Sequence, residues 1–268
     1  MSDAFHVNFR KLLNAEWSNA DITLFSGWHI GYLILVFGLT FLGAFLIRRK
    51  SAEGKENKVL NVLSVIPLII YILNFFMMPL YRSNGQIDLD KLPFHICTII
   101  GIVVVFSQRS KCDWFKEASA GLALTSAMMY MCYPGSALGG VSPFSYKVVE
   151  TFLFHGFLFA YGFIAIASRQ VKLKWKNIWI PLVGLVLIAI WATVGNHLYS
   201  SPEHHYDWFF MTGSTFPFIP KWLMPACSIG AVFGTLTLVY LIYWICVKIQ
   251  EKRNKKIDVV DIIKKDLD

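Results

Sequence analysis

The chain has 268 residues, of which 56% are hydrophobic and only 16% are charged. A soluble domain of this length needs more charge to cover its surface, so the composition indicates that a lipid bilayer solvates part of the chain. The net charge of +8 does not indicate nucleic-acid binding, because Lys and Arg stand between apolar runs rather than on one amphipathic face. The five cysteines form no CxxC pair and no zinc-binding spacing, so no metal and no cofactor is predicted.

Seven apolar stretches follow one another along the chain. They cover residues 28–47, 59–81, 92–107, 115–133, 148–168, 178–198 and 222–249. Most have the roughly 20 residues that an α-helix needs to cross about 30 Å of hydrocarbon, and the third is short. The sequence therefore predicts an all-α polytopic membrane protein, a bundle of about seven transmembrane helices that forms a single domain over residues 1–250.

The basic residues predict how these helices are oriented. The connections at 48–58, 109–116 and 169–176 and the tail from residue 248 hold 19 of the 25 Lys and Arg residues. Cytoplasmic connections of membrane proteins carry such an excess of Lys and Arg. We therefore predict a multi-pass protein of the cell membrane with a short extracellular N-terminal segment and a basic cytoplasmic tail over residues 251–268.

With this orientation, all seven histidines fall in the outer half of the protein. His95 and His155 lie a few residues inside helices that enter from outside. His197 lies near the outer end of the sixth helix, and His29 lies at the outer edge of the first. Ionisable residues inside a membrane are rare and often functional, because burying them in hydrocarbon is costly. A functional site is therefore expected in the outer half.

Cys97 and His155 lie at matching depths in two different helices. At 1.5 Å per residue, both are about 7–11 Å below the outer boundary, which permits contact. An imidazole can take the proton of a thiol and so activate it as a nucleophile. Asn74 and Asn196, at similar or slightly shallower depth, are candidates for orienting that imidazole. The sequence thus suggests Cys97 as a nucleophile and His155 as its base.

Simpler explanations exist for the same residues. A free cysteine in an apolar helix most often packs as a small hydrophobe, and an intramembrane histidine often serves as a structural hydrogen-bond partner or a proton relay. His95 is a poorer base for Cys97, because side chains two positions apart on a helix point about 200° apart. We predict that His95, His29 and His197 contact the substrate rather than act as the base.

Several short motifs, in this order, resemble one family. The segment LPFHIC at 92–97 is similar to the LPxHxC segment of the YwaF-like integral membrane proteins, the family that includes transmembrane protein 164. His29, FLFHG at 152–156, GNHLY at 195–199 with the following Pro202, and Phe216-Pro217 fit in the same order. The family's Thr before Asn is missing at Gly195, and His197 stands where the family more often has Tyr. The resemblance covers roughly residues 25–250.

The resemblance implies an acyltransferase that moves fatty acyl chains between phospholipids, with Cys97 as the nucleophile and His155 as its partner. We expect the thiolate to attack the ester carbonyl of an outer-leaflet lipid and form a thioester, which a lysolipid or a lipoprotein amino terminus then resolves. Asn74, Asn196 and Thr98 are candidates for stabilising the oxyanion. Two alternatives stay open: a lipid ester hydrolase that uses the same dyad, and a noncatalytic seven-helix receptor or transporter.

Overall fold

The computed structural model describes residues 3–49, 55–134, 140–201, 205–211 and 219–265, and within these ranges its regular structure is helical, without β-strands. The helices are α1 (Asp3–Leu13), α2 (Gly27–Arg49), α3 (Lys55–Tyr81), α4 (Ile96–Arg109), α5 (Asp113–Cys132), α6 (Tyr146–Ala167), α7 (Trp179–Tyr199) and α8 (Met224–Lys265). Short 3-10 helices stand at η2 (Leu89–Lys91), η4 (Trp175–Asn177), η5 (Trp208–Phe210) and η6 (Lys221–Leu223). Helices α2 to α8 confirm the seven predicted apolar stretches, and α1 is an addition to them.

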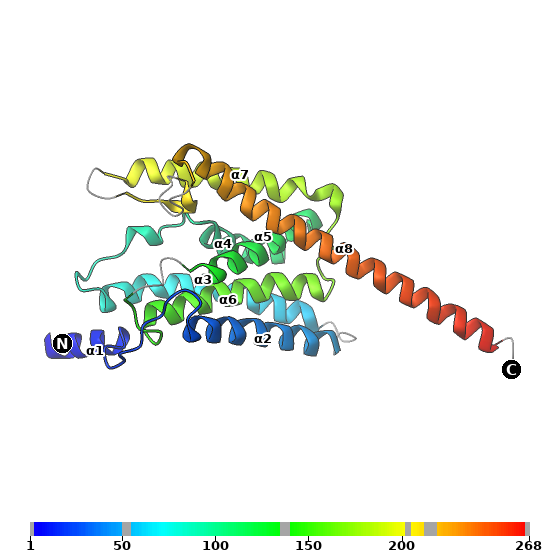
Figure 1. The fold of residues 1–268 in the computed structure, drawn as a ribbon, viewed down its shortest axis with the longest axis horizontal. Coiled ribbons are helices and arrows are strands. Elements are labelled where there is room, and N and C mark those ends of the chain that lie inside the picture. Colours follow the sequence, from blue (N-terminus) through cyan, green and yellow to red (C-terminus); the bar gives the residue numbers. More distant parts are fainter. Residues whose placement is uncertain (1–2, 50–54, 135–139, 202–204, 212–218, 266–268) are drawn as a thin grey trace.

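The long helices lie side by side and successive helices alternate in direction, as Figure 1 shows. Helix α1 shares one end of the bundle with the segments at 82–95, 140–145 and 205–211; we call this the N-terminal end. The other end holds the end of α2, the start of α3 and the connections at 110–112 and 168–178, and α8 projects beyond it. The segments rich in Lys and Arg are therefore together at the end opposite the amino terminus.

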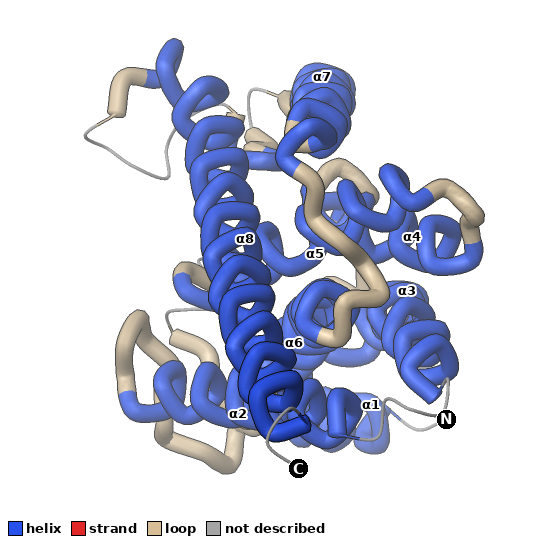
Figure 2. Tube along the Cα trace, turned by 90° about the vertical axis from the view of Figure 1, so that its right-hand side faces the viewer, coloured by secondary structure: helices blue, strands red, loops and turns tan. Residues whose placement is uncertain are grey.

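Six segments are long and apolar enough to cross a membrane, counted over the described residues. Helix α5 is not among them, although its 20 residues are long enough to cross a membrane. It lies near the middle of the bundle and packs against α4, α6, α7 and α8 (Figure 2). Because protein rather than lipid surrounds it, α5 accommodates polar side chains that a lipid-facing helix would not. The fold is that of a polytopic helical membrane protein.

Helix α8 is longer than predicted. It continues without a break through the segment expected as a separate tail and projects beyond the bundle (Figure 1). Its 42 residues span about 63 Å at 1.5 Å each, twice the hydrocarbon thickness of about 30 Å. The segment after residue 249 contains no Gly or Pro to end the helix, and Lys248 pairs with Glu251 one turn on at 3.0 Å.

Helix α4 begins later than its apolar stretch because of Pro93. Proline restricts the preceding residue to extended conformations, and Leu92 has φ −60° and ψ 157°. His95 is also extended, with φ −77° and ψ 143°, and Ile96 is the first helical residue. Helix α4 therefore starts inside a membrane-crossing segment that begins at Leu89.

The segment at 90–95 precedes the regular hydrogen bonding of α4 and leaves backbone carbonyls that lipid cannot satisfy. Three aromatic side chains from other parts of the chain donate to these carbonyls. The bonds run from Trp208 Nε1 to Asp90 O, from the Tyr71 hydroxyl to Lys91 O and from Trp191 Nε1 to Pro93 O, each 2.9 Å long. Side chains from α3, α7 and the η5 segment thus hold the segment that leads into α4 and Cys97.

Candidate active site

A cavity of about 450 Å³ lies in the half of the bundle nearer the N-terminal end. Helices α3, α4, α5, α6 and α8 line it, together with the η2 and η5 regions, and most of its wall is apolar or aromatic. Its volume is in the range of small-molecule sites, and such sites are mostly apolar with a few convergent polar groups. The candidate active site is therefore built around this cavity.

Cys97 lines the cavity as the second residue of α4 and is 5% exposed. The N–H groups in the first turn of a helix have no intrahelical acceptor, and the His95 side chain makes no capping bond to them. These N–H groups and the helix dipole stabilise negative charge at a helix start. The position of Cys97 therefore places its sulfur next to N–H groups that can stabilise an oxyanion formed beside it.

His155 lines the same cavity and is held by three neighbours. Its Nδ1–H donates to the Thr151 carbonyl at 2.8 Å, so Nε2 of the neutral ring is left as a proton acceptor. The Tyr130 ring stacks on the imidazole with centroids 3.9 Å apart and planes at 6°. Phe154 meets it edge-on at 5.0 Å. The ring is thus fixed in one plane and one tautomer, the tautomer that a general base needs.

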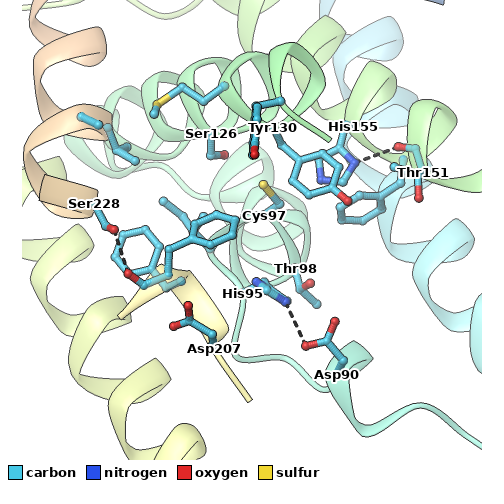
Figure 3. A pocket seen from close by; sticks show the side chains of 18 of the residues that line it. Asp90, His95, Cys97, Thr98, Ser126, Tyr130, Thr151, His155, Asp207 and Ser228 are labelled. Atoms are coloured by element: carbon cyan, nitrogen blue, oxygen red, sulfur yellow. Dashed lines mark hydrogen bonds and ion pairs between the residues drawn. The ribbon is translucent and has the colours of Figure 1, made fainter. Parts of the chain in front are cut away.

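The thiol and the imidazole share the cavity without a direct hydrogen bond between them in the described structure. Figure 3 shows the Cys97 sulfur pointing toward the helix that bears Ser126 and Tyr130, with the Tyr130 ring over the imidazole of His155. Catalytic hydrogen bonds are often long before substrate binds and tighten in the reacting complex. The arrangement is therefore compatible with a thiol and an imidazole that move into hydrogen-bond distance when substrate binds.

His95 lies closer to the site than the helical-angle argument predicted. That argument assumed a helical residue, but His95 precedes α4 in an extended conformation, so its direction relative to Cys97 is not fixed by helical geometry. Its side chain lines the cavity, and its Nε2 lies 3.6 Å from Asp90 Oδ1 (Figure 3). His95 and Asp90 form a partly exposed imidazole–carboxylate pair.

Asn74 and Thr98, two of the three predicted oxyanion-stabilising residues, line the cavity. The Oδ1 atom of Asn74 is buried and has no hydrogen-bond partner among the described residues. The same holds for Oγ of Ser126, which sequence reasoning missed. In a helix rich in Ala and Ser, a single Ser resembles ordinary small-residue packing, and only the three-dimensional structure distinguishes it.

Asn196, the third predicted oxyanion-stabilising residue, does not line the cavity. Its Nδ2 donates to the Trp208 carbonyl at 3.2 Å, and its Oδ1 accepts from the Trp208 N–H at 2.8 Å. Both ends of the amide are therefore used to hold the η5 segment, whose indole binds the Asp90 carbonyl. Asn196 therefore has a structural role: it holds Trp208, which in turn holds the segment before Cys97.

His29 and His197 also lie away from the cavity, contrary to the predicted substrate contacts. His29 is fully buried; its Nδ1 accepts from the Phe25 N–H at 3.0 Å, and its Nε2–H donates to the Met131 carbonyl at 2.8 Å. It therefore ties the start of α2 to the end of α5. His197 is exposed on the outward side of α7.

Four charged side chains on the cavity wall were not singled out from the sequence: Asp90, Lys91, Glu150 and Asp207. Glu150 is 8% exposed and lines the cavity together with Lys91. A carboxylate within the fifth apolar stretch was a signal available in the sequence, because charges inside membrane helices often mark functional sites.

The fold defines a polytopic helical membrane protein with a largely apolar cavity inside its bundle. The sequence pattern of the TMEM164 family matches residues 24–251, and the chain belongs to this family. No curated protein and no solved structure matches it. Three residues of the motifs noted above, Pro202, Phe216 and Pro217, lie outside the described residues.

Proposed function

We propose that this protein is a membrane-embedded acyltransferase with Cys97 as its nucleophile and His155 as its general base. The observation that carries the proposal is a buried thiol and an imidazole in the accepting tautomer on the wall of one largely apolar cavity. A thiol and a histidine whose Nε2 carries no proton are the two parts that thiol-based acyl transfer needs. The activity expected from the LPxHxC motif agrees with this chemistry.

In the first half of the reaction, Nε2 of His155 takes the Cys97 proton and the sulfur attacks the ester carbonyl of a lipid. The carbon–oxygen double bond opens to a tetrahedral oxyanion. When the double bond re-forms, the ester C–O bond breaks and the departing alkoxide takes the proton from the imidazolium. The products are a lysolipid and an acyl thioester on Cys97.

In the second half, a hydroxyl or amine of the acceptor attacks the thioester, and the thiolate leaves. The acceptor proton returns to Cys97 through an imidazole. The His95–Asp90 pair lines the same cavity and is partly exposed, which suits contact with an incoming acceptor such as a lysolipid or a lipoprotein amino terminus.

The apolar wall suits a fatty acyl chain and would limit access of water to the thioester. Phe154, Met129 and Val232 belong to this wall, whereas the charged side chains cluster near the η2 and η5 segments. With the basic end of the bundle in the cytoplasm, the cavity takes lipid from the outer leaflet. If water reached the thioester instead of an acceptor, the same residues would give a lipid hydrolase.

The direct test uses purified full-length protein in vesicles whose phospholipids carry labelled acyl chains. A labelled thioester mapped to Cys97 by mass spectrometry is expected in the wild type. Cys97→Ala should abolish transfer, and His155→Ala should reduce it by about 10²–10⁴-fold. Because the two residues act as one unit, the double variant should be no worse than Cys97→Ala.

Cys227→Ala is the matched control, since this residue is a second thiol on the wall of the same cavity. It should transfer acyl chains like the wild type. An adduct on Cys227, full activity in Cys97→Ala, or no acyl adduct in any variant would each overturn the proposal. The last result would favour a noncatalytic receptor or transporter. Release of free fatty acid without transfer would identify the hydrolase.

A further inference from the structure

Ser126 has an unusual environment for a serine inside a membrane helix. Its side chain is 3% exposed, lines the cavity, and has an Oγ without a hydrogen-bond partner among the described residues. A serine or threonine in a helix commonly bonds a carbonyl one turn earlier, as the adjacent Thr125 does with Gly121 O at 2.9 Å. Leaving such a group unpaired in a buried place costs about 1–3 kcal/mol, so the hydroxyl of Ser126 needs an explanation.

The hydroxyl lies on α5 beside the Cys97 thiol, and both project into the cavity (Figure 3). The hydroxyl is close enough to interact with the Cys97 sulfur, but the geometry of the contact falls outside that of a regular hydrogen bond. The start of α4, whose first-turn N–H groups receive no capping bond from the His95 side chain, borders the same space through Cys97 and Thr98. A small negatively charged atom next to the sulfur would thus meet an O–H donor on one side and a helix start on the other.

We propose that Ser126 is a further catalytic residue, whose hydroxyl donates a hydrogen bond to the oxyanion that forms when Cys97 attacks an ester carbonyl. This inference rests on the proposed acyl-transfer function. The Cys97 sulfur bonds to the carbonyl carbon, and the electron pair of the double bond moves to the oxygen, where the Ser126 O–H stabilises it. When the ester C–O bond breaks, the pair returns and the hydrogen bond weakens. Ser126 itself neither gains nor loses a proton.

Two reagents separate this role from a merely structural one. A p-nitrophenyl ester of a ten-carbon fatty acid acylates a thiol through a tetrahedral oxyanion. An iodoacetamide with a ten-carbon chain alkylates the same thiol by direct displacement of iodide, without addition to a carbonyl. Both rates are measured at Cys97 by mass spectrometry on the purified full-length protein in detergent.

Ser126→Ala should slow acylation of Cys97 by about 10²-fold, as loss of one oxyanion donor does in acyl-transfer enzymes, and leave alkylation unchanged. Thr125→Val is the matched control, because this residue is the next one on α5, equally buried, and has its hydroxyl bonded within the helix. Both of its rates should equal those of the wild type. Unchanged alkylation of Ser126→Ala also shows that the cavity has kept its shape.

Three outcomes would overturn the inference. If acylation and alkylation fall together in Ser126→Ala, the serine positions the thiol and does not stabilise an oxyanion. If neither rate falls, Ser126 has no part in the reaction, although Cys97 remains the nucleophile. If wild-type Cys97 is alkylated but never acylated by the ester, the proposed acyl-transfer function itself fails, and the role of Ser126 fails with it.

Discussion

Replacing Gly195 by alanine should disturb the candidate site through Phe94, a residue that precedes Cys97 by three positions. A Cβ at Gly195 would lie 2.4 Å from Cδ1 of the Phe94 ring. Carbon atoms in contact prefer about 3.5–4.0 Å, so the ring would have to move by about 1 Å. It has little room, because Trp191 lies at 5.1 Å and Trp208 at 4.7 Å between ring centroids.

The expected destabilisation is about 1–3 kcal/mol, the usual cost of forcing extra volume into a packed core. The better helix propensity of alanine offsets up to about 1 kcal/mol of this, which leaves a net loss. Because Phe94 belongs to the segment that carries Cys97, part of the displacement should reach the thiol. A misplacement of about 1 Å at a reacting centre costs up to about 10²-fold in rate.

Thermal unfolding of the purified protein in detergent measures the stability, and acylation of Cys97 by a labelled ester measures the site. Gly184→Ala is the control on the same helix, since its added Cβ would only make an ordinary 3.8 Å contact with Leu122. Gly195→Ala should be less stable and slower than Gly184→Ala. Equal stability and equal acylation of the two variants would refute the packing argument for Gly195.

Two further predictions concern orientation and support of the site. Cysteine labelling in intact cells should reach a position near Lys172 only from the cytoplasm and a position near Asn84 only from outside. The reason is that the basic segments lie together at the end of the bundle that includes the 168–178 connection. The reverse labelling pattern would place the cavity in the inner leaflet. Asn196→Ala should lower the unfolding temperature and slow acylation, since it removes two hydrogen bonds that hold the η5 segment, each worth about 0.5–1.5 kcal/mol. The exposed neighbour His197 provides the control: His197→Ala should change neither quantity, and an equal loss in both variants would contradict a supporting role specific to Asn196.

Much of the fold was predictable because a bilayer imposes simple rules on a sequence. A helix must be apolar over about 20 residues to cross it, and the seven predicted stretches match helices α2 to α8 within a few residues at most ends. At two ends the helix differs from the predicted apolar stretch: α4 starts at Ile96 rather than Leu92, and α8 continues to Lys265. Helix α4 starts later because Pro93 disfavours helical backbone at the residue before it. Helix α8 extends further because the charged sequence after residue 249 contains no Gly or Pro to end it.

The site was predictable only where depth in the membrane was informative. Depth alone put Cys97, His155 and Asn74 in one layer, and the structure brings them to one cavity. Depth also selected Asn196, yet it faces the η5 segment and holds Trp208. The position of a residue along a helix axis follows from its number, but the direction of its side chain depends on which neighbouring helices pack against it.

The sequence by itself determined that the chain is a multi-helix membrane protein and which residues share the layer of the candidate site, because hydrophobic length and charge are local properties. Only the tertiary structure decided that Ser126 faces the thiol and that Tyr130 stacks on His155. Those pairs join α5 to α4 and α5 to α6, and such contacts depend on the rotation of each helix within the bundle. That rotation is set by packing among all the helices at once, which no single segment of the chain contains.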